Sequence, residues 1–375
     1  MNLEEFAAKR HVLAPAGVPI PEGVVCSTPN EAADAVAKIG PSVVKAQVPT
    51  GKRGKSGGIK MANTPDDAAA AARAIIGMSI AGHSVSRVLV EQQCSIVREL
   101  YAAVLTDVGS RSPVVLFSTE GGMDIEEVAE TKPAAVRRHV VDLRSGFGAA
   151  DAAALIEGLS LGSAAAAIAD VLVKLYGIFS TKDAELVEIN PLAILKDGRV
   201  VALDCKFSLD DASALRQPEL AKVASPPRMT ALEAHGAKFG LKFIQLDGNV
   251  GVLANGAGLT MTTMDVIDHF GGRPANFLEI GGEAYTKSEV ALDLVLSNPG
   301  VKSLVVNFCG AFARTDVMAE GVVRAWKNLR PKVPAFFTIH GTGEDEAVKL
   351  VREELGFEPY DLMEDAVKAA VEAAR

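Results

Sequence analysis

A loop rich in glycine and basic residues, Gly51–Gly58, is the first segment whose composition suggests chemistry. Its glycines allow the backbone to approach a phosphate closely, and Lys52, Arg53 and Lys55 offset the charge of a phosphate. The loop is not a P-loop, because no helix pattern follows it. Lys45 lies in the strand pattern that precedes the loop, among apolar residues. The segment therefore predicts either a phosphate-binding flap or an exposed, solvated hairpin that carries a lysine on an edge strand.

A second group of polar residues surrounds a predicted hairpin turn at residues 196–199. Glu188 and Asn190 are two residues apart on a strand, so their side chains share a face. Antiparallel pairing about the turn brings Asn190 close to Asp204, because both are equally far from its centre. An amide oxygen and a carboxylate are hard ligands that suit Mg²⁺. The alternative interpretation is the polar face of an exposed hairpin.

Three glycine-containing loops in the second half of the chain each follow a predicted strand: residues 255–258, Gly281-Gly282 and residues 309–314. The first of them opens a predicted helix, whose N-terminus can hold an anion. In an open α/β sheet, ligands bind beyond the carboxyl ends of the strands. The loops together predict a ligand site at that edge. The six histidines show no metal-binding spacing and support no catalytic triad, although His340 ends a predicted strand.

The elements that must position these residues differ between the two halves of the chain. The first half mixes antiparallel-looking strands with helices and is α+β in character. Thr28 and Glu31 have the spacing of a capping box at the start of one helix. Strands are predicted over 42–48, 87–91, 99–106, 113–118, 184–189, 193–195 and 200–204, and further helices over 2–14, 66–76, 123–129, 132–138, 149–157 and 162–178.

The second half alternates strands and helices regularly, which is typical of an α/β fold with a doubly wound parallel sheet. The strands are predicted over 249–253, 275–280, 303–308 and 335–339, and the helices over 259–269, 287–296, 316–328, 344–355 and 361–373. Two prolines in the segment 222–228 interrupt both helix and sheet. We therefore expect two domains, residues 1–225 and 226–375.

Composition excludes several classes of protein. With 49% hydrophobic and 23% charged residues, the chain of 375 residues is not intrinsically disordered. A formal charge of −9 argues against a nucleic-acid coat or a polybasic membrane binder. The four cysteines are far apart, which favours free thiols, and the N-terminus lacks the apolar core of a secretory signal. Asp170 and Lys174 interrupt the longest apolar stretch, so we expect a packed helix rather than a membrane span, in a cytoplasmic enzyme.

The motifs taken together resemble, over essentially the whole chain, the β subunits of the succinyl-CoA synthetase family, which are ADP- or GDP-forming acid–CoA ligases. The segments that carry the resemblance are Val43–Val48, Arg53–Gly58, Arg98–Tyr101, Ser118–Gly122, Val187–Leu192, Leu246–Asn249, Asn255–Leu259 and Pro274–Leu278. The resemblance implies an ATP-grasp first half followed by a flavodoxin-like CoA-ligase half.

The resemblance also assigns roles to residues of this chain. It implies nucleotide-phosphate binding by Lys45, Lys52, Arg53 and Gly54, further nucleotide contacts by Glu91 and Glu99, and a base pocket lined by Cys94. It implies Mg²⁺ ligation by Asn190 and Asp204, and it makes Glu188 the acid that positions a phosphorylated histidine. It implies an organic-acid pocket at Asn255, Ala311, Phe312 and Ala313.

The family's reaction implies partners for this chain. An acid is converted to an acyl phosphate, CoA attacks it, and the phosphoryl group travels by a histidine to or from ATP or another nucleotide. That histidine and most of the CoA site lie on a separate α subunit, in an αβ or α2β2 assembly. A nucleotide-binding regulatory subunit without turnover, and a carboxylate–amine ligase built on the same first half, are the alternatives.

Three segments of the sequence depart from the family pattern. Residues 49–55 differ from the usual His-Ala-Gly-Gly-Arg-Gly-Lys, and residues 340–344 differ from a Gly-Asn-Asn type of loop. Residues 310–314 read Gly-Ala-Phe-Ala-Arg where Gly-Gly-Ile-Val-Arg is usual. The last change reshapes the pocket for the acid's carboxylate. We therefore expect the nucleotide chemistry to be retained and the acid to be one other than succinate, or not succinate alone.

Overall fold

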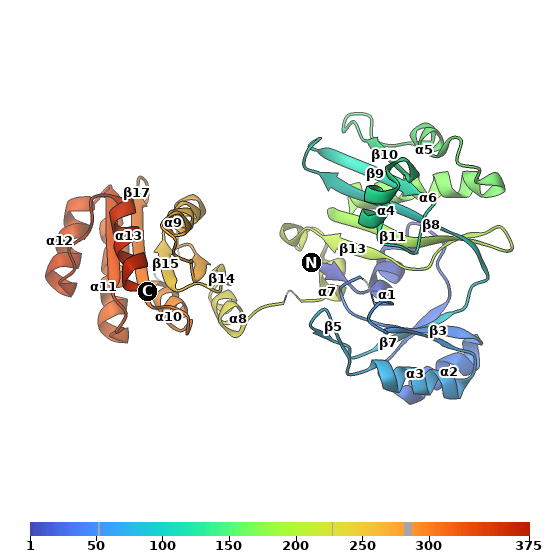
Figure 1. Cartoon of the computed structure of the whole chain (residues 1–375), viewed down its shortest axis with the longest axis horizontal. Helices are drawn as coiled ribbons and strands as arrows, with labels where there is room; N and C mark the ends of the chain where they lie inside the picture. Colours follow the sequence, from blue (N-terminus) through green and yellow to red (C-terminus); the bar gives the residue numbers. More distant parts are fainter. Residues whose placement is uncertain (52, 227, 281–286) are drawn as a thin grey trace. The chain divides into compact units, whose positions relative to one another are not determined.

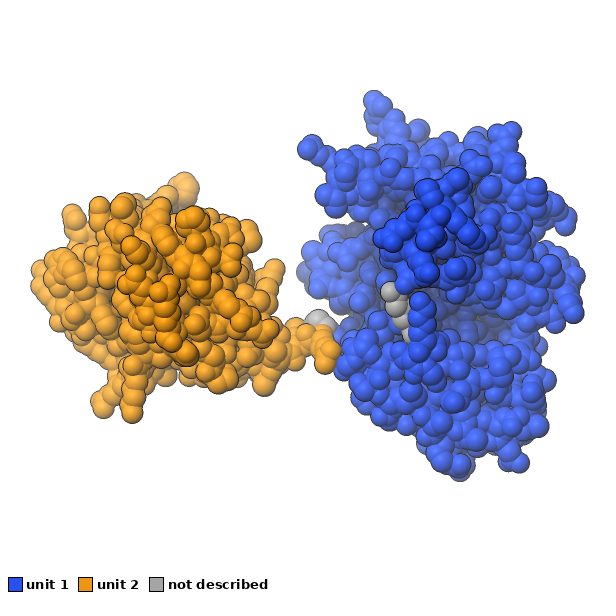
Figure 2. All heavy atoms as spheres, viewed as in Figure 1, with its two compact units in different colours: residues 1–227 blue, residues 228–375 orange. Residues whose placement is uncertain are grey.

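The computed structural model describes residues 1–51, 53–226, 228–280 and 287–375. The chain divides into two compact units, residues 1–227 and residues 228–375 (Figures 1 and 2). Each unit has its own hydrophobic core. The predictions that concern Lys52 and the Gly281-Gly282 loop lie outside the described residues.

The first sheet of unit 1 is antiparallel, and helices cover one of its faces (Figure 1). Its strand order is β2 (Gly23–Cys26), β7 (Val88–Gln92), β3 (Ser42–Ala46) and β4 (Ile59–Ala62). The covering helices are α2 (Pro29–Ile39) and α3 (Pro65–Ile75), whose alanines pack on alternate strand residues such as Val44 and Val90. Thr28 caps α2 by accepting the N–H of Glu31, as predicted, but Glu31 accepts the N–H of Ser27 and so does not complete a capping box. Helix α3 has the complete capping box, formed by Thr64 and Asp67.

The second sheet of unit 1 is larger and also antiparallel. Its order is β1 (Asn2–Leu3), β13 (Lys206–Leu209), β11 (Ala184–Leu195), β8 (Ile96–Asp107), β9 (Ser112–Ser118) and β10 (Val136–Val140), with β12 (Val200–Ala202) also paired to β11. The core beneath it contains side chains from the helices α1 (Glu5–Ala8), α5 (Ala149–Ile156) and α6 (Ala165–Thr181). A π-helical turn over Lys9–Leu13 continues α1. Smaller elements are β5 (Ser79–Ile80), β6 (His83–Ser84), α4 (Ile125–Thr131) and α7 (Pro218–Val223).

Helix α6 and the residues before it form the one segment of the described chain that is long and apolar enough to cross a membrane. Six of the helix's side chains, including Leu172 and Leu175, are buried in the core of unit 1. Packing on the large sheet therefore accounts for its apolar composition, as the sequence predicts.

One strand prediction and two helix predictions for unit 1 need correction. The strands predicted over 184–189 and 193–195 are a single strand, β11. The prediction of a helix over 132–138 is wrong, because Pro133–Ala135 forms a single 3₁₀ turn and β10 then begins at Val136. Pairing with β9 outweighs the helix propensity of the two alanines, and the valines of β10 suit an edge strand. The first helix begins at Glu5 and not at residue 2, because Asn2 and Leu3 pair with β13.

Unit 2 is a doubly wound α/β fold, as predicted. Strands β15 (Val250–Ala254), β17 (Ser303–Gly310) and β18 (Ala335–Gly341) are parallel neighbours. Single parallel bridges place β16 (Asn276–Leu278) beside β15 and Tyr360 beside β18, which gives the flavodoxin-like order 2-1-3-4-5. The short β14 (Phe243–Gln245) pairs antiparallel with β16 and follows helix α8 (Ala231–Lys238).

Helices cover both faces of the sheet of unit 2. One face packs against α9 (Ala257–His269) and α13 (Met363–Ala373), and the other against α10 (Ser288–Leu296), α11 (Thr315–Leu329) and α12 (Glu344–Leu355). Burial on both faces explains why the strands are continuous apolar runs.

Candidate active site

The candidate site in unit 1 is a cavity of about 570 Å³ between its two sheets. Figure 2 shows the surface of unit 1 hollowed near its middle. Strand alternation explains which residues reach the cavity: in β3, Val44 faces the covering helices, whereas Val43 and Lys45 line the cavity. The same alternation in β11 buries Ile189 in the core and directs Glu188 to the cavity. The faces of the two sheets that carry no helix layer thus supply the polar lining.

Six charged side chains meet at the inner end of this cavity, and we call them the ion cluster: Glu5, Lys9, Lys45, Arg53, Glu91 and Asp204. The ammonium group of Lys45 donates to Glu5 Oε1 (2.8 Å), to Glu91 Oε2 (2.6 Å) and to the carbonyl oxygen of Leu203 (2.6 Å). Lys9 donates to the same three residues at 2.6–2.7 Å. The three protons of each ammonium group are therefore all engaged.

Glu5 is the centre of the ion cluster. Its Oε1 accepts from both lysines, and its Oε2 accepts from Arg53 Nη1 at 2.6 Å. The other terminal nitrogen of Arg53 contacts both carboxylate oxygens of Asp204 at 2.6 Å. Asp204, with its side chain 31% exposed, is the most accessible member, whereas Glu5 is 1% exposed. The outer Arg53–Asp204 pair is therefore the part of the cluster that a ligand reaches first.

The surrounding charges set the protonation of the buried members. Burial by itself raises the pKa of Glu5, but the ammonium groups of Lys45 and Lys9 and the guanidinium of Arg53 outweigh it and hold that pKa well below its usual range. Burial acts to lower the pKa of Lys45, and the carboxylates of Glu5 and Glu91 overcome it, so the pKa of Lys45 is raised. Glu5 and Lys45 are therefore both charged at neutral pH.

The predicted pairing of Asn190 with Asp204 is confirmed. Strand β11 pairs antiparallel with β12 through Leu192–Ala202 and with β13 through Glu188–Lys206. Asn190 and Asp204 lie between these two pairs in the same register, and both line the cavity. Asn190 also accepts the N–H of Gly122 at 2.8 Å and donates to the carbonyl of Met123 at 2.8 Å.

The donor set fits a magnesium ion only in part as it stands. Among the described residues, no group of three or more His, Cys, Asp or Glu side chains is arranged to hold a metal ion. Mg²⁺ does not require such a group, because it takes one or two protein oxygens together with phosphate oxygens and water. The bond from Gly122 uses one of the two lone pairs of Asn190 Oδ1. Asp204 is held by Arg53, so an ion must compete with that guanidinium for it.

Glu188 lies beside this pair on β11 and also lines the cavity. The hydroxyl of Tyr101 contacts its Oε2 at 3.4 Å, and Lys206 is its direct partner across the sheet. Burial raises the pKa of Glu188, and the positive charge of Lys206 opposes the shift only in part. Glu188 is therefore a half-buried carboxyl group that faces the cavity without belonging to the ion cluster.

The other residues that the resemblance assigns to a nucleotide also line the cavity: Gly54, Glu91, Cys94 and Glu99. The loop that carries Gly121 and Gly122 packs directly on β8, where a side chain at Gly122 would overlap the carboxylate of Glu99. Gly122 also has a φ of +71°, which favours glycine. Burial raises the pKa of the Cys94 thiol, so it is not an activated nucleophile.

The candidate acid site of unit 2 lies at the carboxyl ends of β15 and β17, next to the point where the strand order reverses. The side chain of Asn255 bridges the two strand ends: its Nδ2 donates to the carbonyl of Cys309 and its Oδ1 accepts the N–H of Cys309, both at 2.8 Å. Thr342 donates to the carbonyl of Ala311 at 2.9 Å, which ties the loop after β17 to the loop after β18. The side chain of Phe312 is fully exposed at the tip of its loop.

Two residues of the ion cluster, Glu5 and Lys9, were missed by sequence reasoning, which treated residues 2–14 as an ordinary helix. The signal that could have found them is their spacing. Glu5 and Lys9 are four residues apart and share a helix face with Val12 and Leu13, which are core residues. Charged residues on a core-facing stripe need partners elsewhere in the fold.

Both halves of the chain match described domain families. Residues 2–194 match the ATP-grasp domain, and residues 253–371 match the CoA-ligase domain. The chain is 42% identical over 355 residues to the β subunit of the GDP-forming succinate–CoA ligase of Thermus thermophilus, covering 94% of this chain and 93% of that one. It is 43% identical over 380 residues to the β subunit of the ADP-forming succinate–CoA ligase of Chloroflexus aurantiacus, covering 100% of this chain and 99% of that one.

A solved structure shares the fold over the full length. The ATP citrate lyase of Methanothrix soehngenii, in complex with citrate and coenzyme A, superposes with a TM-score of 0.76 at 22% identity and 99% coverage of both chains. At this identity the similarity concerns the fold alone. The full-length relatives at over 40% identity and the two matching domains show that this chain belongs to the succinate–CoA ligase β-subunit family, with an ATP-grasp domain followed by a CoA-ligase domain.

Proposed function

We propose that this chain is the nucleotide-binding β subunit of an ADP- or GDP-forming acid–CoA ligase that acts on a small carboxylic acid together with an α subunit. The observation that carries the proposal is the cavity of unit 1, which Lys45, Arg53, Glu91, Asn190 and Asp204 all line. A nucleoside triphosphate requires cations for its phosphates and oxygen ligands for its divalent metal ion. Relatives named for ADP and for GDP are about equally similar to this chain.

In this proposal the phosphates contact Lys45, Arg53 and Gly54, together with Lys52. Glu91 and Glu99 make further nucleotide contacts, and Cys94 lines the pocket of the base. Arg53 and Asp204 neutralise each other in the ion cluster, and Asp204 is its most accessible member. We infer that nucleotide binding exchanges partners at this pair. Arg53 then releases Asp204 and turns its guanidinium to a phosphate. The planar guanidinium presents parallel N–H donors, which suit the oxygens of a phosphate.

The released carboxylate of Asp204 and the amide oxygen of Asn190 would hold Mg²⁺. A bound magnesium ion neutralises phosphate charge during phosphoryl transfer. The residues of the chain itself orient the nucleotide. Lys45 acts on the phosphates through its charge, because its three protons are already held by Glu5, Glu91 and the carbonyl of Leu203. A cation that is held in place in this way is preorganised, and preorganised charge is a main source of electrostatic stabilisation in enzymes.

Glu188 is the acid that we assign to the phosphorylated histidine of the α subunit. Its half-buried carboxyl group faces the cavity beside Asn190 and can accept a hydrogen bond from an imidazole N–H. The described part of unit 1 shows no histidine among the residues that line this cavity, which agrees with a phosphoryl carrier on a partner chain. We expect CoA to bind mainly on the α subunit, in an αβ or α2β2 complex.

The acid pocket is assigned to Asn255, Ala311, Phe312 and Ala313 in unit 2. Asn255 holds the ends of β15 and β17 together, so the pocket lies where ligands bind in open α/β sheets. The exposed Phe312 stands where the family pattern has Ile, and Ala311 stands where it has Gly. We propose that these changes alter acid selection, so that succinate is not the only substrate and another small, substituted acid is used.

The decisive experiment is turnover by the chain purified together with its α subunit. ATP or GTP, CoA and a panel of small carboxylic acids are supplied, and nucleoside diphosphate release is measured. Asp204→Asn should lower turnover at least about 100-fold, because the site loses a charge that acts in the transition state. Asp197→Asn, which changes an exposed aspartate paired with Arg199, is the matched control and should leave turnover unchanged.

Calorimetry on the chain alone separates the remaining outcomes. The wild type should bind the magnesium nucleotide, and Asp204→Asn should not. A wild type that binds no nucleotide contradicts the proposal. A wild type that binds nucleotide, but supports no turnover with any acid in the presence of its α subunit, is a regulatory subunit instead.

A further inference from the structure

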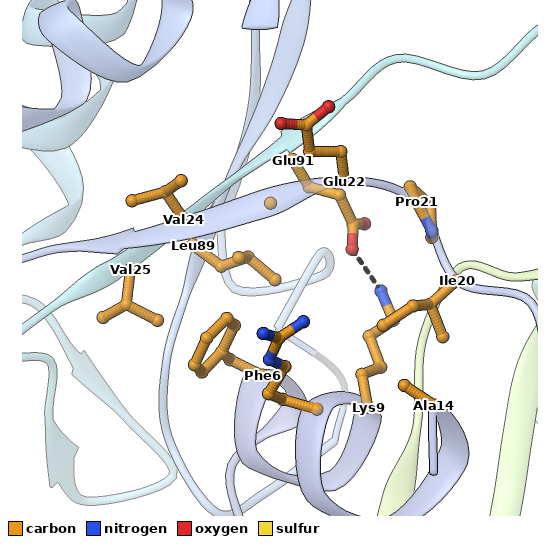
Figure 3. Close-up of a pocket in the computed structure, with 12 residues that line it drawn as sticks. Phe6, Lys9, Ala14, Ile20, Pro21, Glu22, Val24, Val25, Leu89 and Glu91 are labelled. Carbon is orange, nitrogen blue, oxygen red and sulfur yellow. Dashed lines mark hydrogen bonds and ion pairs between the residues drawn. The ribbon is translucent and has the colours of Figure 1, made fainter. Parts of the chain in front are cut away.

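Lys9 is a buried cation that the assigned nucleotide contacts do not use. Its side chain is 2% exposed, and its ammonium group reaches the carboxylates of Glu5 and Glu91 from helix α1 and the turn that follows it. It is not among the described residues that line the 570 Å³ cavity of the candidate site. It lines a second cavity of about 710 Å³ on the other side of the ion cluster, where Figure 3 shows it bonded to Glu91 between Phe6 and Ile20.

The charge balance of the ion cluster depends on this lysine. Once Asp204 leaves Arg53, the remaining members are three cations and two carboxylates, with a net charge of +1. Without Lys9 the net charge is zero, because Glu5 and Glu91 neutralise Lys45 and Arg53 completely. Lys9 and Lys45 each contact both Glu5 and Glu91 within 2.8 Å, and these four side chains are at most 9% exposed. Because little water reaches them, the net charge is screened little.

We propose that Lys9 is a positioning residue of the nucleotide site: it binds Glu5 and Glu91 from behind and so supplies the net positive charge that the phosphates meet at Lys45 and Arg53. This inference rests on the proposed function. Lys9 touches neither nucleotide nor metal, and acts through the two carboxylates that it shares with Lys45. A long-range charge of this kind has a specific signature, because its effect grows with the number of phosphate charges on the ligand.

The test is the affinity of the full-length chain for a series of ligands, measured by calorimetry with Mg²⁺ present: nucleoside, monophosphate, diphosphate and triphosphate. The base is the one that the wild type binds. Lys9→Met should weaken triphosphate binding about tenfold, the diphosphate less, and the nucleoside less than about twofold, because removing one buried charge changes only charge-dependent binding. Lys174→Met, which removes a lysine paired with Asp170 on α6, is the control and should leave the whole series unchanged.

A second variant guards against loss of folding. In Lys9→Met/Glu5→Gln the net charge of the cluster returns to +1 without a change at an assigned nucleotide contact, and the glutamine still offers an oxygen to Lys45. Its triphosphate-to-nucleoside affinity ratio should return to within about threefold of the wild type. Equal weakening of all four ligands in a folded Lys9→Met, or a double variant without preference for the triphosphate, overturns the inference. A wild type that binds no nucleotide overturns the proposed function instead, so the two failures are distinct.

Discussion

The candidate sites of the two units differ in the groups that form them and in how deeply those groups are buried. In unit 1 the site consists of charged side chains of which Glu5, Lys9 and Arg53 are at most 4% exposed, and each holds others in place. In unit 2 the site consists of strand ends and loops, joined by one asparagine side chain and backbone groups, with Phe312 fully exposed. The ion cluster is thus part of the core of its unit, whereas the loops of unit 2 are not.

This difference predicts how each site can change during evolution. A substitution in the ion cluster leaves a buried charge without a partner, which destabilises the fold as well as the site. A substitution at the tip of the loop after β17 removes no buried contact. The asymmetry predicts that the residues proposed to bind the nucleotide persist while the loop after β17, at residues 310–314, departs from the family pattern.

The strongest way to test the comparison is to remove the centre of the ion cluster. Glu5→Ala leaves Lys9, Lys45 and Arg53 without their shared carboxylate, and we expect it to lower the free energy of unfolding of unit 1 by about 3–5 kcal/mol. Hydrogen exchange of peptides from β8 and β11 reports on unit 1. The fluorescence of Trp326, the only tryptophan in the sequence and located in α11, reports on unit 2.

The matched control is Glu219→Ala. Glu219 also forms an ion pair with a lysine, but its side chain is 82% exposed, so we expect a change below about 1 kcal/mol. The Trp326 signal should stay at its wild-type transition in both variants. Equal effects of the two substitutions on exchange in unit 1 would remove the distinction between the two kinds of site.

The pH dependence of stability should also separate the two units. The pKa of Glu5 is held well below its unfolded value of about 4.3, so its contribution is fully present above that pH and is lost as the pH falls through the folded value. The raised pKa of Glu188 acts in the opposite direction. Its protonated form stabilises the folded state at low pH, and this contribution is lost as the pH rises through the folded pKa. We expect unit 1 to lose stability steeply below about pH 4.3.

Urea unfolding at several pH values between 3 and 7, followed by circular dichroism and by Trp326 fluorescence, measures this dependence. Glu5→Gln is the informative variant, because it keeps the shape of the side chain and removes the titration. Its stability should vary less with pH on the acid side than that of the wild type. If Glu5→Gln and the wild type lose stability in parallel below pH 4, the ion cluster is not the origin of the acid sensitivity.

The loops of unit 2 should respond to backbone geometry rather than to charge. Gly341, at the end of β18, has a φ of +101°, and a side chain there would overlap the carbonyl oxygen of Gly310. We expect Gly341→Ala to lower the free energy of unfolding of unit 2 by about 2 kcal/mol. Trp326 packs against Phe337 of β18, so its fluorescence during urea unfolding reports the change.

Gly356→Ala is the control for backbone strain alone. Gly356 ends α12 with a φ of +72°, and the space around its missing side chain is open. We expect a loss of about 1 kcal/mol, the usual cost of a left-handed conformation. A loss at Gly341 no larger than the loss at Gly356 would show that the contact with Gly310 does not constrain the loops.

The parts of the site that could be predicted from the sequence are those that local geometry determines. Asn190 and Asp204 are equally far along the chain from the centre of a short turn, so antiparallel pairing about that turn places them opposite each other. Strand alternation puts Glu188 on the same face as Asn190. The contact of Glu5 with Lys45 and Arg53 could not be found in this way, because it joins segments about 40 residues or more apart through the packing of α1 between two sheets. The strand β10 was missed for the same reason, since its pairing with β9 decides its conformation.

The smallest expected change in stability is at Phe312. Because its side chain is fully exposed, Phe312→Ile, which restores the family's residue, should alter the free energy of unfolding by less than about 0.5 kcal/mol. We nevertheless expect it to raise kcat/KM for succinate relative to larger acids about tenfold. In the proposed function Phe312 borders the bound acid, and a small change of apolar volume beside a substrate is worth that much discrimination. The measurement is the ratio of kcat/KM values for the complex with its α subunit.

Leu215→Ala provides the matched control, because Leu215 is a large apolar residue of unit 1 that is 95% exposed. Neither stability nor acid preference should change in that variant. An unchanged preference in Phe312→Ile would mean that the loop after β17 does not select the acid. Such a result would not bear on the proposed nucleotide site of unit 1, because the ion cluster shares no residue with that loop.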